Sequence, residues 1–505
     1  MYRIFLVIIS LVLSAVSLTA QGQQAAQPYR LTLNDVVELA KMQSPMAIQA
    51  RHQFRAAYFS FISYKANFLP KLTLTTNPTS WDKSIRTIPS FNDKGELVYK
   101  ETKGNTLTSE AWLALSQNIG LTGGSIALRS DFTRTQNFLQ TNSKEATSYT
   151  TNPVRLTLTQ PLNGYNQLRW EKKIEPLAYE EARQRYIVEL ENVSSNAVDM
   201  FFNLAEAQVN LNIAGTNLNS SEELYRITQG RYNVGSVGED DLLRVELRHM
   251  QATSKLNSAK VQIESAQNRL RSFLGFRDNV NIELLIDTDI PGFKVEYEKA
   301  LDLALTRNPN ILAYQQQLLE SERLVALAKS QTGITIQLDA TFGTNKTGYA
   351  FKDAYSTPYG DREGVSLQIK VPILDWNQTR NRYRQRQSEL EVRQAQVQQS
   401  ETTFRQNVFL QVMSFNLQED QVRIAAKSDT IAQRSYEITY QRYMSSKSTI
   451  TDLNLADTAK DEAKVGYIEA LNRYWTLYYS VRQYTLFDFQ NNKPLEEDLD
   501  SIIEN

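Results

Sequence analysis

Residues 193–218 read VSSNAVDMFFNLAEAQVNLNIAGTNL, and apolar side chains recur in this stretch at steps of four and three. The positions are Val193, Ala197, Met200, Leu204, Ala207, Leu211, Ala214 and Leu218. This is the heptad spacing of helices that pack along their length. One helix from Leu168 to Tyr232 would be about 100 Å long, at about 1.5 Å per residue. The stretch therefore predicts long packed helices rather than a compact domain.

The heptad pattern recurs because the chain contains a tandem duplication. The pairs that match at a constant offset of 211 positions include Pro161-Leu162 with Pro372-Ile373, Arg231-Tyr232 with Arg442-Tyr443, and Asp241-Leu242 with Asp452-Leu453. Upstream, Leu39-Ala40 and Pro45 match Leu303-Ala304 and Pro309 at an offset of 264. The first copy therefore holds about 53 additional residues between its two matched blocks.

Each copy has the same order: helix, strand region, very long helix, turn and second long helix. The predicted organisation is a signal peptide at 1–22, a first repeat at 23–290 (strands about 68–162, long helices about 166–274), a second repeat at 291–485 (strands about 332–373, long helices about 377–485) and a C-terminal tail at 486–505. The fold class is mixed α and β, with long antiparallel coiled-coil helices.

The strand regions alternate apolar and polar side chains. Ile334 to Phe342 and Val365 to Val371 are the clearest examples, and Leu72, Leu74 and Val154 to Leu158 repeat the pattern in the first copy. This alternation fits a half-buried soluble sheet, and it equally fits transmembrane barrel strands with lipid on one side and water on the other. Two strands per copy give four per chain, too few to close a barrel, so closure would require oligomerisation.

The additional residues predict one more hairpin. Trp112 to Ile119 and Ser125 to Phe132 flank a turn that contains Gly123-Gly124, a good hairpin signal. The pair either lengthens a surface loop or adds strands to the barrel, which would give eighteen strands per trimer. We favour twelve strands with an elaborated hairpin, and we expect polar outer loops at Asn77 to Asn105 and Thr135 to Asn152.

Composition excludes several functions. The 505 residues carry 55 Lys+Arg against 56 Asp+Glu, which argues against a nucleic-acid partner. There is no Cys and there are only two His, so disulfides, thiolate metal sites and Cys nucleophiles are absent, and a zinc or Ser-His-Asp site would need two distant histidines. We find no phosphate-binding Gly loop. The sequence predicts no enzyme, no cofactor and no metal site.

The N-terminus predicts export. A short basic start at Met1 to Arg3 precedes the apolar run Ile4 to Val16, and small or polar residues follow, so we expect signal-peptide cleavage near Ala20 to Gly22. The mean hydropathy of −0.44 is far too low for a bundle of membrane-spanning helices. If the mature protein crosses a bilayer, it must do so as a β-barrel.

Together these residues resemble the TolC-type outer-membrane efflux proteins. The resemblance rests on the opening LTLNDVVELA at 31–40 with Ser44-Pro45, the strand ends Pro161-Leu162 and Pro372 to Asp375, and the helix-turn-helix tips at 231–243 and 442–453. It implies a homotrimer whose twelve strands form one outer-membrane β-barrel, in contact with outer-membrane lipid, and whose long helices form a periplasmic tunnel. Such a trimer is the exit duct of a tripartite pump, meeting a periplasmic adaptor (membrane fusion protein) at its tips and serving an inner-membrane transporter.

The resemblance also implies roles at the tips. The gate or constriction candidates are Asp241, Tyr443 and Asp452, and the adaptor-contact candidates are Arg231, Tyr232, Gly235, Arg442, Ser446 and Lys447. For the aspartates, ordinary helix capping is the alternative role. The chain departs from the family pattern where Ser446 replaces the turn glycine, Ser448 an arginine and Leu455 a second aspartate, so Lys447 or Arg442 are possible substitutes in the gate.

The predicted function is a passive export duct in the outer membrane of a Gram-negative bacterium, with a large periplasmic extension. Two alternatives remain open. One keeps the fold and makes the chain the outer-membrane component of a type I protein secretion system. The other is a soluble periplasmic coiled-coil scaffold without a pore.

Overall fold

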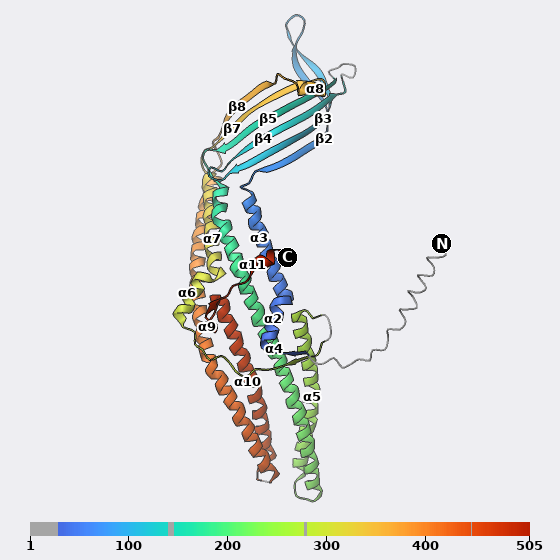
Figure 1. The fold of residues 1–505 in the computed structure, drawn as a ribbon, viewed down its shortest axis with the longest axis vertical. Helices are drawn as coiled ribbons and strands as arrows, with labels where there is room; N and C mark the ends of the chain where they lie inside the picture. Colours follow the sequence, from blue (N-terminus) through green and yellow to red (C-terminus); the bar gives the residue numbers. More distant parts are fainter. Residues whose placement is uncertain (1–28, 140–145, 277–279, 446, 505) are drawn as a thin grey trace, which may run out of the picture. The chain divides into compact units, whose positions relative to one another are not determined.

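The computed structural model describes residues 29–139, 146–276, 280–445 and 447–504 (Figure 1). The predicted signal peptide and Ser446 lie outside these residues. The chain divides into a helical unit, built from the described parts of 1–54, 184–308 and 403–505, and a sheet unit, built from 55–183 and 309–402. These units do not follow the two repeats, since each contains segments of both.

The helices occur in matched pairs of identical length. They are α2 (Leu33–Gln43) and α6 (Tyr297–Arg307), α3 (Pro45–Ala66) and α7 (Pro309–Ser330), α4 (Gln167–Asn233) and α9 (Gln378–Met444), and α5 (Glu239–Leu274) and α10 (Ile450–Thr485). The members of each pair start at the same two offsets that relate the repeats in the sequence. The predicted long helices and tandem repetition are therefore confirmed. Among the described residues, no helix has the length and apolar character needed to cross a membrane.

Local sequence sets the helix boundaries. α2 begins at a capping box, in which Thr32 and Asp35 each bond the backbone N–H of the other, and it ends at Ser44, whose extended backbone precedes Pro45. α10 begins at an equivalent box formed by Thr449 and Asp452. α5 ends at Gly275, which adopts the left-handed conformation that favours glycine.

The sheet unit is built on six antiparallel strands. These are β2 (Lys71–Phe91), β3 (Leu97–Ile119), β4 (Gly124–Asn137), β5 (Thr147–Pro161), β7 (Thr335–Gly348) and β8 (Gly360–Lys370), paired in that order, and the short helix α8 (Phe351–Ala354) joins β7 to β8. Figure 1 shows these strands side by side in one sheet. The strands β2 and β8 are its edges, and every residue of β8 is exposed.

The predicted extra hairpin is present as β3 and β4, but it belongs to the sheet rather than to a surface loop. Its turn lies at the end of the sheet where strands meet helices: the Asn118 side chain donates to the carbonyl of Asn67 at 3.0 Å, and the Asn166 side chain donates to the carbonyl of Gly120 at 3.2 Å. Asn67 follows α3 and Asn166 precedes α4. The preferred count of four strands is therefore wrong for this sheet, and the six-strand alternative matches it.

The two predicted outer loops are also shorter than expected. β2 continues to Phe91 and β3 begins at Leu97, so most of 77–105 is a β-ribbon with a short turn, and β5 begins at Thr147. Threonine, serine and charged residues dominate these stretches. These stretches lack the alternating apolar face of a typical strand, so their hydropathy alone indicated loops. Backbone hydrogen bonds to the neighbouring strand nevertheless hold them in the sheet.

One face of the sheet is apolar and exposed. Cross-strand neighbours carry aliphatic residues over all six strands. Leu72 of β2 pairs with Leu115 of β3, Leu115 pairs with Leu128 of β4, and Leu128 pairs with Leu156 of β5. Leu338 of β7 pairs with Leu367 of β8. Leu72 is 63% exposed and Leu367 is 54% exposed. Threonine, serine, glutamine and charged residues make up most of the opposite face. A face of this kind is stable only when lipid or another apolar partner covers it.

The helical unit also contains small elements. They are β1 (Tyr29–Leu31) parallel to β6 (Ile282–Leu284), β9 (Phe487–Asp488) antiparallel to β10 (Lys493–Pro494), and α11 (Leu499–Glu504). Among the largest fully buried side chains of this unit are Phe201, Leu204, Leu270, Phe415 and Tyr474.

A buried ion network joins the two repeats within the helical unit. Glu191 of α4 is 2% exposed, and its carboxylate pairs with Lys41 of α2 at 3.0 Å and with Arg482 of α10 at 2.8 Å. Arg482 also pairs with Asp488 at 3.3 Å. Burial disfavours the Arg482 cation, but the charges and hydrogen bonds of Glu191 and Tyr478 together outweigh this and raise the pKa of Arg482.

Replacing Glu191 by Gln removes the anion that Arg482 and Lys41 share. Breaking a buried ion pair from one side typically costs about 3–5 kcal/mol, so we expect a clearly lower unfolding temperature by circular dichroism. The control is Glu389→Gln, which removes the exposed partner of Arg386 on α9 and should leave the unfolding temperature unchanged. Equal shifts in the two variants would contradict a stabilising role for the network.

Candidate functional site at the helical tips

The two helical hairpins of the helical unit end close together. α4 turns into α5 between Asn233 and Glu239, and α9 turns into α10 between Met444 and Ile450. A hydrophobic cluster joins them: Leu224, Val245, Ile450 and Leu453 are buried, with Tyr225, Tyr436, Tyr440 and Tyr443 packed against them. The tips of the first and second repeats thus share one core.

Asp452, a predicted gate residue, is held in its own turn. Its Oδ2 accepts hydrogen bonds from the Thr449 backbone N–H at 3.0 Å, the Thr449 hydroxyl at 2.7 Å and the Ser448 hydroxyl at 3.1 Å. These bonds, led by that of the Thr449 backbone, hold the pKa of Asp452 below its usual value. The capping alternative therefore describes its local geometry, and the carboxylate stays ionised at neutral pH while exposed to solvent.

The other two gate candidates differ in setting. Tyr443 is half-buried against the tip cluster. Asp241 is half-buried in the first turn of α5, beside Glu239 and Asp240, where three carboxylates complement the helix dipole. The preceding N-cap is Gly238, which has no side chain for capping.

Among the adaptor-contact candidates, Arg231 links the two tips, because its guanidinium donates to the carbonyl of Met444 at 3.0 Å. Gly235 has a φ of 70°, and the backbone N–H of Gly235 and Ser236 bond the carbonyls of Tyr232 and Arg231. A left-handed residue is required there, which explains the glycine. Tyr232 is 39% exposed.

In the second turn Arg442 and Lys447 are exposed, and the Lys447 N–H donates to the carbonyl of Arg442 at 2.8 Å.

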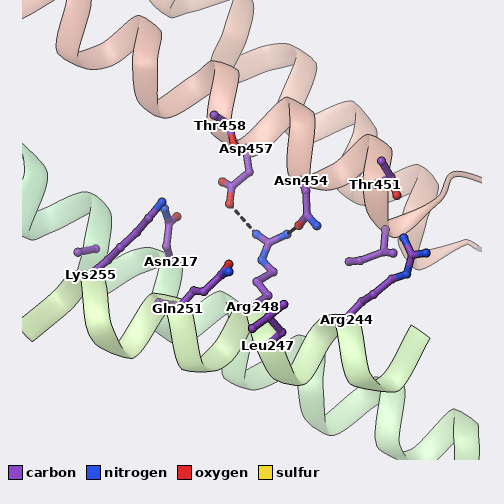
Figure 2. A pocket seen from close by; sticks show the side chains of 13 residues that line it. Asn217, Arg244, Leu247, Arg248, Gln251, Lys255, Thr451, Asn454, Asp457 and Thr458 are labelled. Atoms are coloured by element: carbon purple, nitrogen blue, oxygen red, sulfur yellow. Dashed lines mark hydrogen bonds and ion pairs between the residues drawn. The ribbon is translucent and has the colours of Figure 1, made fainter. Parts of the chain in front are cut away.

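A polar network that sequence reasoning missed lies beside the tip cluster (Figure 2). Arg248 of α5 reaches across to α10, where its guanidinium pairs with Asp457 at 2.6 Å and also bonds the side chain of Asn454. The side chains of Arg248 and Asp457 are only 13% and 11% exposed. This ion pair is therefore well shielded from solvent and joins the first repeat to the second.

The network continues along α10 and back to α4. Lys460 pairs with Asp457 at 2.6 Å and with Asp461 at 3.3 Å, and its ammonium lies 4.1 Å from the centre of the Tyr436 ring. Asp461 in turn accepts a hydrogen bond from Asn217 at 2.7 Å. Burial raises the pKa of Asp461 despite the neighbouring Lys460.

The sequence carried only a partial signal for this network. Lys460 stands at a seam position that an uncharged core would not use, and it aligns with His249 of the first repeat. His249 stacks on Tyr225 and lies 3.4 Å from the Ser221 hydroxyl, so it packs within its own hairpin. In the part of the chain that the structure describes, no group of His, Asp and Glu side chains forms a candidate metal site.

Comparison with known proteins now bears on this arrangement. The family model of the outer membrane efflux proteins matches residues 119–276 and 300–485. No curated protein sequence matches the chain.

Solved structures with the same fold include the Campylobacter jejuni CmeC outer membrane channel, at 19% identity and a TM-score of 0.65, covering 94% of this chain and 88% of that one. The outer membrane protein VceC from Vibrio cholerae has 12% identity and a TM-score of 0.60, covering 92% and 97%. The open state of the Neisseria gonorrhoeae MtrE outer membrane channel has 14% identity and a TM-score of 0.58, covering 92% and 91%.

The family match covers well over half of the chain and confirms the resemblance seen in the sequence. It also confirms the predicted localisation in the outer membrane of a Gram-negative bacterium, with a large periplasmic helical extension. The chain belongs to the outer membrane efflux protein family.

Proposed function

We propose that the chain forms a homotrimeric outer-membrane channel, the exit duct of a tripartite efflux pump that opens at its helical tips. The observation that carries the proposal is the sheet, with one exposed apolar face, one polar face and two unpaired edges. A lipid bilayer offers no partner for the backbone groups of a sheet edge, so such a sheet spans a membrane only when its edges are paired. The proposal assigns the chain no enzymatic activity, cofactor or metal.

Closure follows from pairing β8 of one copy with β2 of the next. This contact uses two different edges, so it repeats around a ring until the ring closes. With three copies, as the family resemblance implies, the six strands of each chain give an eighteen-stranded barrel. Barrels of about this size leave a water-filled channel.

Two exposed apolar stripes on the helical unit support the same assembly. On α9, Leu410, Leu417, Ile424, Ile431 and Ile438 recur at heptad spacing and are 48–58% exposed. On α5, Leu243, Leu247, Met250 and Val261 are 56–71% exposed. Heptad stripes without a partner are typical of helix–helix interfaces. We assign them to each other, with α9 of one copy packing against α5 of the next.

The gate in this proposal depends on two kinds of contact at the tips. Within a copy, the Arg248–Asp457 pair and the tip cluster hold the second hairpin against the first. Between copies, the carboxylates of Asp452 and Asp241 approach their equivalents near the threefold axis and favour cations, with Tyr443 behind them. The adaptor engages the two turns through Arg231, Tyr232, Gly235, Arg442, Ser446 and Lys447, and an inner-membrane transporter supplies the energy.

Placing charges in the α9 stripe tests the trimer. The double variant Ile424→Asp with Ile431→Asp should dissociate the detergent-solubilised trimer, because burying each aliphatic side chain contributes about 1.5–3 kcal/mol. Native mass spectrometry reports the mass. Gln433→Asp, on the opposite side of the same helix, is the matched control and should remain trimeric. An intact trimer in the double variant would rule out this interface.

Removing the Arg248 charge tests the gate. Arg248→Gln should raise the resting open probability in planar bilayers about tenfold if the pair contributes about 1.4 kcal/mol to the closed state. Arg248→Lys keeps a positive charge opposite Asp457 without disturbing Lys460, the other partner of Asp457, and should hold the open probability nearer the native value. Arg434→Gln, which breaks an exposed pair with Glu437 on α9, is the control. Equal open probabilities in all variants would remove Arg248 from the gate.

Neutralising Asp452 separates gating from capping. Asp452→Asn keeps a side-chain oxygen that can accept the Thr449 backbone N–H, as the third helical residue of the capping box does, but loses the charge. A role in the constriction therefore predicts a change in conductance or a weaker preference for cations. The unfolding temperature measures any loss of the cap itself. Native currents from this variant would leave Asp452 with a capping role alone.

A further inference from the structure

Three arginines lie in one row across the polar face of the sheet. In the strand register Arg129 of β4 pairs with Arg155 of β5, Arg155 pairs with Gly343 of β7, and Gly343 pairs with Arg362 of β8. The same row continues to Ala114 of β3, which pairs with Arg129. The three guanidinium groups therefore start from the same level of the sheet.

Like charges at paired positions repel and destabilise a sheet, so this row needs compensation. Asp131, whose side chain is 7% exposed, forms ion pairs with both Arg129 and Arg155. The Arg129 guanidinium also lies 4.5 Å from the centre of the Trp112 ring, where the π-face attracts a cation. One carboxylate thus compensates two of the three charges, and the row keeps a net positive charge.

The other acids of this face reduce the excess without cancelling it. Glu110, paired with Thr133 on a neighbouring row, attracts Arg129, and Asp339 lies on another row, paired with Thr159. Asp339 is further held by the Thr159 hydroxyl at 2.9 Å and by the side chain of Gln337. Arg362 lies on β8, where every residue is exposed, and the ion pairs of Asp131 do not include it.

We propose that this row lines the lumen as an anion-selective ring, and that the duct favours anionic solutes, carrying carboxylate or phosphate groups, at this level. The inference rests on the proposed duct, in which the apolar face meets lipid and the polar face meets water. Three copies place nine arginines at one height. Rings of arginine select anions, and the planar guanidinium group offers paired donors that match carboxylate and phosphate oxygens.

The inserted hairpin supplies one of the three arginines of the row, together with the groups that hold it. Arg129, Asp131 and Trp112 all lie on β3 and β4, the two strands that the second repeat lacks. Register shifts next to Asp131 and next to Arg155 mark bulges in the paired strands, and bulges re-aim side chains. The insertion therefore adds two strands to the sheet and the aspartate that joins Arg129 to Arg155, whereas the net positive charge of the row comes from Arg155 and Arg362.

Arg362→Gln gives the sharpest test, because Arg362 is exposed on an edge strand and outside the Asp131 ion pairs. In planar bilayers under a potassium chloride gradient, the ratio of chloride to potassium permeability should fall about twofold or more. Inorganic phosphate on one side should reduce the chloride current of the native channel and do so less in the variant. Lys94→Gln, in the turn between β2 and β3, removes an equal charge away from the row and should change neither readout.

Asp131→Asn tests the opposite change. It removes a negative charge from the row, so the preference of the channel for chloride should rise. Native permeability ratios in Arg362→Gln and in Asp131→Asn would overturn the ring and leave Asp131 as a brace between β4 and β5. A native protein that forms no channels would instead overturn the duct itself, so the two failures are distinguishable.

Discussion

The sheet imposes the constraint on which the rest of the structure depends. Its aliphatic face spans six strands and is largely exposed, and both its edges are unpaired. Exposure of the aliphatic face to water is unfavourable, and exposure of the unpaired edges to lipid is also unfavourable. Both problems disappear together when copies of the chain join edge to edge with their aliphatic faces outward. A protein that spans a membrane by strands must pair every sheet edge, so its secondary structure already constrains how its copies assemble. A helix satisfies its own backbone groups, so a protein that spans by helices is under no such constraint.

The helical unit carries two kinds of contact surface, a polar one between its own hairpins and an aliphatic one on its outside. The duplicated helices have equal lengths, yet the link at Arg248 exists only once, because Ala459 stands at the equivalent position of the second repeat. Inside the chain the hairpins meet through shielded ions and a tyrosine-lined cluster, while the outward stripes on α5 and α9 are aliphatic. Ion pairs demand specific geometry and break on a small displacement, whereas aliphatic stripes tolerate sliding. This division suits an assembly whose copies stay together while its hairpins move.

Much of this architecture was predictable from the sequence, for identifiable physical reasons. Helix periodicity, capping residues such as Thr32 and Thr449, and the two constant offsets specify the helices locally. The strand count was not predictable in the same way. The stretch from Asn77 to Asn105 is polar, and its strands depend on backbone pairing with each other, which a one-dimensional pattern does not record.

At the tips, too, local contacts could be predicted from the sequence and long-range contacts could not. The family resemblance singled out Asp452 as a gate candidate, its place at a helix start gave the capping alternative, and its capping bonds are local, within four residues. The Arg248–Asp457 pair joins residues about two hundred positions apart, and finding it requires the register of one hairpin against the other. Charged residues at seam positions, as at Lys460, are the one signal that the sequence does offer, because a buried charge needs a partner.

The inserted hairpin of β3 and β4 is an integral part of the sheet. In the second repeat, β7 and β8 are neighbours, so the duplicated fold needs only two strands per copy. The first repeat places β3 and β4 between its equivalent strands, at the same height and with the same aliphatic face, and anchors their turn beside the helix–strand junctions. A mere surface elaboration would need neither the continuous aliphatic face nor the arginine row with its bridging aspartate. In the proposed duct the insertion is better explained as a change to the wall, because it adds two strands to the sheet and brings Asp131 between Arg129 and Arg155.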